Sequence, residues 1–507
     1  MKGAIAAGHR LTAETGARVL EEGGNAVDAC VAAGVASWVA ESTLTGPGGG
    51  GFMLVHRLGD DVTRVFDFFV SVPGLGAAPA IPAKMEEIDV DFAESSVAYR
   101  IGAASCAVPG AAAGLEAAHR AFGSLPWSVL FEPAIELARR GVELTPQQAH
   151  LHAILDLILR HTDEGRRVYG RGERRLVARD VLVQPDLATT LETIAALGAA
   201  DLYRGELARA VAGHVGEQGG TLTLRDLEEY RVIRRRPVRA RFLGHELASN
   251  PPPSTGGILI GYGLRLLDRL GVAGAPGSAE AMAQVVEIMR EQDRARDSRF
   301  GRDLYRGGLA RKLYDEVAVA AGVERVRGTT HISVVDERGT AASFTASTGS
   351  GSGVIVPGTG IHLNNMLGEF DLAGSGGTLP AGTRMTSMMA PSLVLREGVP
   401  RLAVGSAGSR RLRGAVMQIV INSIVHELPV EEAIARPRVH LEGEHVHCEG
   451  GAEPAEVDRL EALGYDIVRW RRRNLFFGGA AAVEVGTDGT LAAAGDPRRG
   501  GVGIVLR

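Results

Sequence analysis

Two threonines, Thr329 and Thr330, begin a stretch of the chain that is suited to nucleophilic chemistry. They follow Gly328 and lead into an alternating, β-branched run that ends at Asp336. A glycine presents an unhindered carbonyl and reaches backbone conformations that are closed to other residues. A threonine hydroxyl beside that carbonyl can attack it, which gives an acyl shift from nitrogen to oxygen and then cleavage of the chain. The α-amine released on Thr329 can then act as the base for its own hydroxyl.

The turn that follows determines which residue lies opposite Thr329. Residues 336–340, Asp-Glu-Arg-Gly-Thr, predict a three-residue hairpin loop with Gly339 in the left-handed conformation. Pairing the two ends of this loop places Thr329 opposite Ser347, within about one register step. Two hydroxyl groups would then meet at the end of the hairpin. The same residues also suit an ordinary strand, so this segment alone does not establish catalysis.

The elements that must position this hairpin indicate a mixed fold, helix-rich before Thr329 and strand-rich after it. Apolar spacing predicts helices at 13–22 (with Thr12 as its cap), 25–39, 110–122, 127–141, 147–159, 186–197, 203–218, 257–270, 279–297 and 413–426. Besides the hairpin, strands are predicted at 52–56, 64–70, 242–249, 392–395, 402–404, 480–485 and 491–494. The polar residues 324–328 are predicted to form a flexible segment.

The bulk composition limits the classes of function. The chain has 507 residues, 45% hydrophobic and 23% charged, with a net charge of −5 and no long run of one sign. Binding to nucleic acid or to an anionic membrane is therefore not favoured. No apolar stretch is long enough to span a membrane and the start does not resemble a signal peptide, so we expect a cytoplasmic protein. The cysteines and histidines show no ligand spacing, so we predict no metal and no cofactor.

Further stretches, in this order along nearly the whole chain, resemble those of γ-glutamyltranspeptidases. They are residues 23–29, 46–53, 251–257, 329–331, 363–365, 387–388, 405–408 and 435–438. The resemblance implies an α+β fold, a four-layer αββα sandwich of the N-terminal-nucleophile hydrolase type. It also implies self-cleavage into chains 1–328 and 329–507, which stay together as one αβ heterodimer. An acyl intermediate on the threonine oxygen would be released by water or by an amine.

The resemblance further implies catalytic roles for four residues. Thr329 matches the nucleophile, and Ser347 matches the second threonine that hydrogen-bonds the nucleophile during processing. Gly408 and Ser409 match a glycine pair whose backbone N–H groups form the oxyanion hole. Ser409 departs from the second glycine but keeps a backbone donor.

Donor recognition is where the sequence departs most from the family. Thr386 and Ser387 match the serine pair that holds the donor's α-carboxylate, and Glu369 matches an aspartate that binds its α-ammonium group. Phe69, however, stands where the family has an arginine that clamps the α-carboxylate. Met366 replaces a polar residue near the ammonium group. The loss of a charge-assisted arginine–carboxylate contact is a large chemical change.

Several functions stay open at this point. The first is a changed small-molecule acyl donor, such as an amide or C–C bond hydrolysed in antibiotic biosynthesis. Glutaryl or cephalosporin acylases and an oxamate amidohydrolase are other relatives with changed donors. Alternatively, Arg410 or Arg411 supplies the missing charge and the protein is an ordinary γ-glutamyl hydrolase. An unprocessed binding protein is the non-catalytic alternative, and the intact Gly328–Thr329 junction argues against it.

Overall fold

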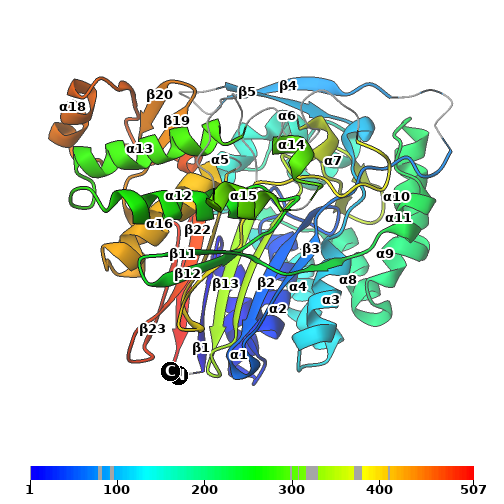
Figure 1. Ribbon diagram of the computed structural model, residues 1–507. Helices are drawn as coiled ribbons and strands as arrows, with labels where there is room; N and C mark the ends of the chain where they lie inside the picture. The colour runs from blue at the N-terminus through cyan, green and yellow to red at the C-terminus, as the bar shows by residue number, and fades with distance from the viewer. Residues whose placement is uncertain are drawn as a thin grey trace.

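The computed structural model describes residues 2–77, 81, 83–91, 96–296, 300–306, 308–315, 329–369, 379–408 and 411–507. Within these ranges helices and strands are mixed, as the sequence predicted. Two large sheets form the centre, and helices cover their outer sides (Figure 1). Gly328, Ser409, Arg410 and the predicted flexible segment 324–328 lie outside the described residues.

The first sheet has seven strands, each antiparallel to its neighbours. Their order across the sheet is β10 (Ile233–Arg235), β3 (Val62–Phe68), β2 (Gly50–Arg57), β14 (Ala341–Ser347), β13 (Thr330–Asp336), β1 (Gly3–Ala7) and β24 (Val502–Leu506). Successive side chains point to opposite faces. Ala4 and Ala6 therefore join the core shared with the second sheet, whereas Ile5 and Ala7 join the core beneath the helices.

The second sheet has six antiparallel strands and packs against the first. Its order is β11 (Val238–Phe242), β12 (His245–Ser249), β17 (Ser392–Arg396), β18 (Val399–Ala407), β22 (Gly479–Val485) and β23 (Leu491–Gly495). Serine hydroxyls join the two sheets, because Ser333 donates to the Ala481 carbonyl and Ser343 to the Val404 carbonyl, each at 3.3 Å. The interface is therefore hydrogen-bonded as well as apolar.

Helices cover the outer side of each sheet (Figure 1). Those packed on or next to the first sheet are α1 (Arg10–Glu21), α2 (Ala26–Ala40), α3 (Ala111–Phe122), α4 (Glu132–Arg140), α8 (Pro185–Leu197), α9 (Ala200–Arg204) and α10 (Glu206–Glu217). All of α2 is buried, and the Asn25 side chain caps it in a capping box. On the second sheet lie α12 (Gly256–Leu270) and α16 (Arg411–Val420), with α13 (Ala279–Arg294) packed on α12.

Shorter elements complete the described chain. The helices are α5 (Pro146–Ile154), α6 (Asp156–Leu159), α7 (Asp163–Tyr169), α11 (Leu224–Glu229), α14 (Phe300–Asp303), α15 (Leu309–Asp315), α17 (Val430–Ala435) and α18 (Pro454–Ala462). Two of the small sheets pair β4 (Glu86–Asp91) with β5 (Ser96–Ile101), and β20 (His445–Cys448) with both β19 (Val439–Glu442) and β21 (Asp466–Arg469). The others are two-stranded and pair β6 (Val142–Glu143) with β9 (Val181–Leu182), β7 (Gly170–Arg171) with β8 (Arg174–Arg175), and β15 (Ile355–Val356) with β16 (Ile361–His362). Among the described residues no helix is long and apolar enough to cross a membrane.

The structure corrects several predicted elements. The helix predicted from residue 13 begins at Arg10 and is capped by His9, while Thr12 is buried and donates to Glu41 at 2.9 Å. Residues 242–249 are not one strand, because a turn at Leu243 (φ +42°) separates β11 from β12. The segment predicted as a helix from residue 127 starts as the 3-10 helix η3 (Trp127–Phe131), and the one predicted to end at 426 finishes as the π-helix η5 (Ile421–Val425).

Candidate active site

The hairpin of β13 and β14 has the predicted register. Gly339 lies in the loop with φ +73°, and Thr330 pairs with Ala346. Thr329 immediately precedes β13, and Ser347 is the last residue of β14. The two hydroxyl-bearing residues therefore stand side by side at one end of the hairpin. Both are buried, Thr329 with 3% of its surface exposed.

Neighbouring strand ends extend this edge of the sheet toward the donor-binding residues. Ser347 pairs with Gly50 at the start of β2, and the next strand, β3, ends one residue before Phe69. Phe69 therefore lies three strands from Thr329. At the usual spacing between strands the backbone separation is about 14 Å. A long side chain at position 69 could reach into the space between them.

The glycine run at 46–51 lets β2 begin against the backbone of β14. A Cβ atom on Gly49 would lie 2.5 Å from the carbonyl oxygen of Ser347, and one on Gly51 would lie 2.3 Å from that of Thr345. Both distances are too short for any side chain. The run is thus explained by close packing next to Ser347.

His331, two residues after Thr329, is not placed to act as a catalytic base. Its Nδ1 lies 2.7 Å from the Thr345 hydroxyl and its Nε2 2.9 Å from the Ser333 hydroxyl. Burial lowers the pKa of His331 to about 3, so the ring stays neutral. A Cβ on Gly405 would lie 2.3 Å from the ring, which shows how closely β18 packs on β13. The imidazole is therefore hydrogen-bonded within the first sheet and packed against the second, so another group must act as the base.

Gly408 follows β18 and has φ +117°, a conformation that side chains rarely adopt. The Nε of Arg411 donates to its carbonyl at 3.4 Å, and the Arg411 guanidinium lies 3.9 Å from the centre of the Phe476 ring. Burial lowers the pKa of Arg411 to about 9. Within the described part of the chain its Nη1 has no hydrogen-bond partner. Ser409, the other predicted oxyanion residue, is outside that part.

Thr386 and Ser387 lie on a segment that runs beside the end of β3. The backbone N–H of Met385 donates to the carbonyl of Val70 at 3.1 Å. The Thr386 hydroxyl donates to the Pro253 carbonyl at 2.8 Å, and Ser387 is buried. The predicted carboxylate-binding pair and the position that lacks the arginine are thus neighbours.

The side chain at position 69 packs among apolar residues, whereas its backbone contacts charged ones. Phe69 stacks on Phe52 with 5.6 Å between ring centres and is 1% exposed. Met366, 2% exposed, belongs to the same hydrophobic cluster. The nearby cation, Arg384, donates to the Phe69 carbonyl and lies 3.4 Å from Asp67. Its charge is therefore used within the core.

Glu369 lies close to the loop that follows Ser347. A Cβ on Gly349 would lie 2.5 Å from the Glu369 Oε1 and 2.1 Å from the Asn365 Oδ1. The Gly349 N–H also donates to the Ser347 hydroxyl at 2.7 Å. The carboxylate predicted to bind an ammonium group thus lies beside the glycine whose N–H donates to Ser347.

Two charged residues that the sequence patterns did not single out contact the start of β13. Arg499 donates from Nη1 to the Thr329 carbonyl, and Glu41 accepts from the Thr330 hydroxyl at 2.6 Å. The sequence signal for Glu41 is its position directly after a helix whose residues are mostly small and apolar. Such a residue has to be paired when it is buried.

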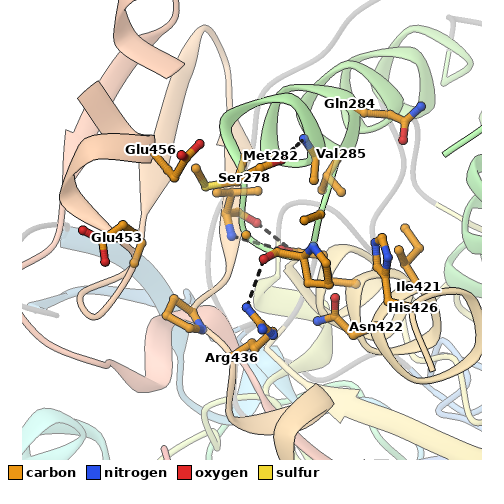
Figure 2. A pocket seen from close by; sticks show the side chains of 18 of the residues that line it. Ser278, Met282, Gln284, Val285, Ile421, Asn422, His426, Arg436, Glu453 and Glu456 are labelled. Carbon is orange, nitrogen blue, oxygen red and sulfur yellow. Dashed lines mark hydrogen bonds between the residues drawn. The ribbon is translucent and has the colours of Figure 1, made fainter. Parts of the chain in front are cut away.

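A cavity of about 430 Å³ lies away from these residues, between α13, η5, the start of β19 and α18 (Figure 2). None of the candidate site residues lines it. Its polar side chains hold the surrounding elements together, since Arg436 donates to the Pro276 carbonyl at 3.2 Å and Glu456 accepts from the Ala279 N–H at 2.7 Å. We therefore do not include this cavity in the active site.

Replacement of Ser347 gives a test of the hairpin geometry. Ser347→Ala removes the hydroxyl beside Thr329, and we expect self-cleavage to slow by about tenfold or more, the effect of one lost hydrogen bond. Ser347→Thr keeps the hydroxyl and should process at close to the wild-type rate. Intact mass spectrometry over time measures both. Equal rates for the alanine and threonine variants would contradict the role of this hydroxyl.

Comparison with known proteins shows which family this chain resembles along its length. The family model described as Gamma-glutamyltranspeptidase matches residues 12–506. The acylase ACY 1 proenzyme of Pseudomonas sp. (strain SE83) is 31% identical, covering 100% of this chain and 94% of the relative. The glutathione hydrolase proenzyme of Escherichia coli (strain K12) is 30% identical, covering 98% and 90%. The crystal structure of cephalosporin acylase from Bacillus halodurans superposes with a TM-score of 0.82 at 25% identity, covering 100% and 96%.

The fold and these matches define an enzyme of the hydrolase and acyltransferase class that uses an N-terminal nucleophile. The chain belongs to the γ-glutamyltranspeptidase family.

Proposed function

We propose that this chain is a self-processing hydrolase whose nucleophile is Thr329. Its hydroxyl attacks the Gly328 carbonyl, the peptide nitrogen leaves as the α-amine, and water hydrolyses the resulting ester. The freed amine then deprotonates the Thr329 hydroxyl for attack on a donor. Backbone N–H groups at Gly408 and Ser409 stabilise the oxyanion, and the acyl ester is released by water or an amine. The observation that supports this best is the hairpin register, in which Thr330 pairs with Ala346 and Thr329 therefore lies beside Ser347.

The two products of this cleavage, 1–328 and 329–507, would stay together as one αβ unit in an αββα arrangement. β1 of the first piece pairs with β13 and β24 of the second. β2 pairs with β14, and β12 with β17. Because each large sheet contains strands from both pieces, separation would expose both cores.

We further propose that the donor is not glutathione but a small molecule whose amide or C–C bond is hydrolysed in a biosynthetic pathway. The buried Phe69 provides no cation for an α-carboxylate. The presence of acylases among the similar proteins is in keeping with a changed acyl group. Apolar surroundings at Phe69 and Met366 favour a less charged donor.

γ-Glutamyl hydrolysis is the second candidate, and Arg411 is the observation that favours it. This guanidinium is buried beside Gly408, and its Nη1 is unpartnered within the described residues. A buried donor of this kind is costly unless a ligand pairs with it. A donor carboxylate would be such a ligand.

Restoring the arginine separates the two candidates. We expect Phe69→Arg to hydrolyse γ-glutamyl-p-nitroanilide about tenfold or more faster than the charge-free control Phe69→Leu, because a charge-assisted hydrogen bond to the α-carboxylate is gained. Both variants lose the stacking on Phe52, so they share that cost. Initial rates with each purified, processed variant give the comparison. Equal rates in the two variants would show that the absence of an arginine at position 69 does not explain a changed donor.

Intact mass spectrometry of the purified wild-type protein tests the proposal itself. Two fragments, the second beginning at Thr329, are expected. The processed protein is then assayed against γ-glutamyl, glutaryl and other acyl amides to identify the donor class. A wild-type chain that stays whole after prolonged incubation would overturn self-processing and would favour a non-catalytic binding protein.

A further inference from the structure

Arg499 is held against the nucleophile by the structure around it. It lies in the turn between β23 and β24, and its Nη1 donates to the carbonyl of Thr329. Gly479 lies opposite, and a Cβ there would approach the Arg499 Cδ to 2.3 Å. Only a glycine leaves room for the arginine in this position. Burial lowers the pKa of Arg499, yet a guanidinium stays charged near neutral pH.

Glu41 provides the opposite charge on the neighbouring residue. Its carboxylate accepts from the Thr330 hydroxyl at 2.6 Å and from the Thr12 hydroxyl at 2.9 Å. A Cβ on Gly8 would lie 2.6 Å from one of its oxygens, so the backbone also packs closely here. Glu41 and Arg499 line the same cavity of about 30 Å³. Thr329 thus contacts a cation, Arg499, and Thr330 contacts an anion, Glu41.

We propose that Arg499 is a positioning residue for the nucleophile: it holds the Thr329 carbonyl in place once the chain is cut, and its charge keeps the new α-amine unprotonated near neutral pH. This rests on the proposed function, since only a cut chain has that amine. A new chain end at the start of a strand frays unless it is tied down. A cation within about 6 Å disfavours the ammonium form, and a nearby carboxylate such as Glu41 favours it.

The other titratable groups near the start of β13 do not replace Arg499. Burial lowers the pKa of His331 to about 3, and it also lowers the pKa of His9, so both are neutral at pH 7. Asp496 forms buried ion pairs with Arg438 and Arg498. Glu369, next to Gly349, carries a carboxylate and so provides no positive charge. Arg499 is therefore the cation in contact with Thr329 among the described residues.

The test measures the protonation of the α-amine directly and needs no donor. Cyanate carbamoylates only the unprotonated amine, so the rate of Thr329 modification against pH, followed by peptide mass spectrometry, gives its apparent pKa. We expect Arg499→Gln to raise this pKa by about one unit and Arg499→Lys to leave it nearly unchanged. Glu41→Gln, which keeps hydrogen-bonding capacity, should lower it. Arg471→Gln is the charge-matched control, because Arg471 is exposed.

Opposite shifts in the two glutamine variants support the proposal, since a merely structural role would not reverse sign. An unmoved pKa in Arg499→Gln, or shifts in the same direction in both variants, would overturn it. If Arg499→Gln does not fold, an unmoved pKa in Glu41→Gln overturns it instead. A wild-type chain that is never cut would overturn the proposed function as well, whereas a cut chain with unmoved pKa values overturns this inference alone.

Discussion

Thr329→Ala is expected to remain a single uncut chain and to lose turnover by at least about 10⁴-fold, because it removes the proposed nucleophile of both self-cleavage and donor hydrolysis. The loss of one buried hydroxyl costs only about 1 kcal/mol of folding stability. The fold should therefore persist, with both sheets intact. Intact mass spectrometry, thermal unfolding and assay on whichever donor the wild type hydrolyses measure the three effects.

Thr330→Ala is the matched control for this variant. It removes a hydroxyl one residue away, which donates to Glu41 on the helix side of the sheet. We expect it to be destabilised slightly and to cleave itself normally. Cleavage in Thr329→Ala together with an uncut Thr330→Ala would show that the nucleophile has been placed one residue too early.

Gly408→Ala should lower kcat by about 10² to 10³-fold with little change in KM, the effect of one misplaced oxyanion donor. The residue has φ +117°, and a Cβ there would lie 3.1 Å from the Cα of Gly478. Alanine must rotate this peptide away from its present orientation, and the N–H turns with it. Steady-state kinetics on a donor that the wild type hydrolyses would show the effect in kcat.

Gly443→Ala separates this effect from backbone strain in general. Gly443 has φ +61° in an exposed turn, and a Cβ there would meet no atom within 4 Å. The variant carries a left-handed alanine, which costs about 1 kcal/mol, but has no contact with β18. We expect wild-type kcat. An equal loss of kcat in both variants would argue against an oxyanion role for Gly408.

Local sequence rules were sufficient to predict the hairpin and the strands β2 and β3, and insufficient to predict β1 and β24 on its other side. The loop at 336–340 requires Gly339 and a short connection, and these fix the register of β13 with β14. β1 was missed because Gly3 to Ala7 is short and carries a single β-branched residue. It is a strand because β13 and β24 flank it on both sides. β24 was missed too, since its partner is at the other end of the chain.

The site shows the same division. The position of Thr329 beside Ser347 follows from the loop, whereas the roles of Gly408, Glu369, Thr386 and Ser387 are implied by the resemblance to a family. Contacts between β18 and β13, and between the end of β3 and the segment around Met385, bring these residues toward the sheet edge that holds Thr329. Such contacts join residues that are far apart in the sequence, and they leave no periodic pattern. Arg499 was overlooked for that reason.

The position of β1 between β13 and β24 has a consequence for how the mature protein would unfold. An uncut chain folds in a unimolecular reaction, since β1 and its partners are tethered. After a cut before Thr329, the same strand order has to be assembled from two molecules. Refolding would then depend on protein concentration. The folded enzyme, in which both sheets contain strands from both pieces, would persist because it unfolds slowly. After self-cleavage the stability of the protein would thus be set by its rate of unfolding and no longer by a reversible folding equilibrium.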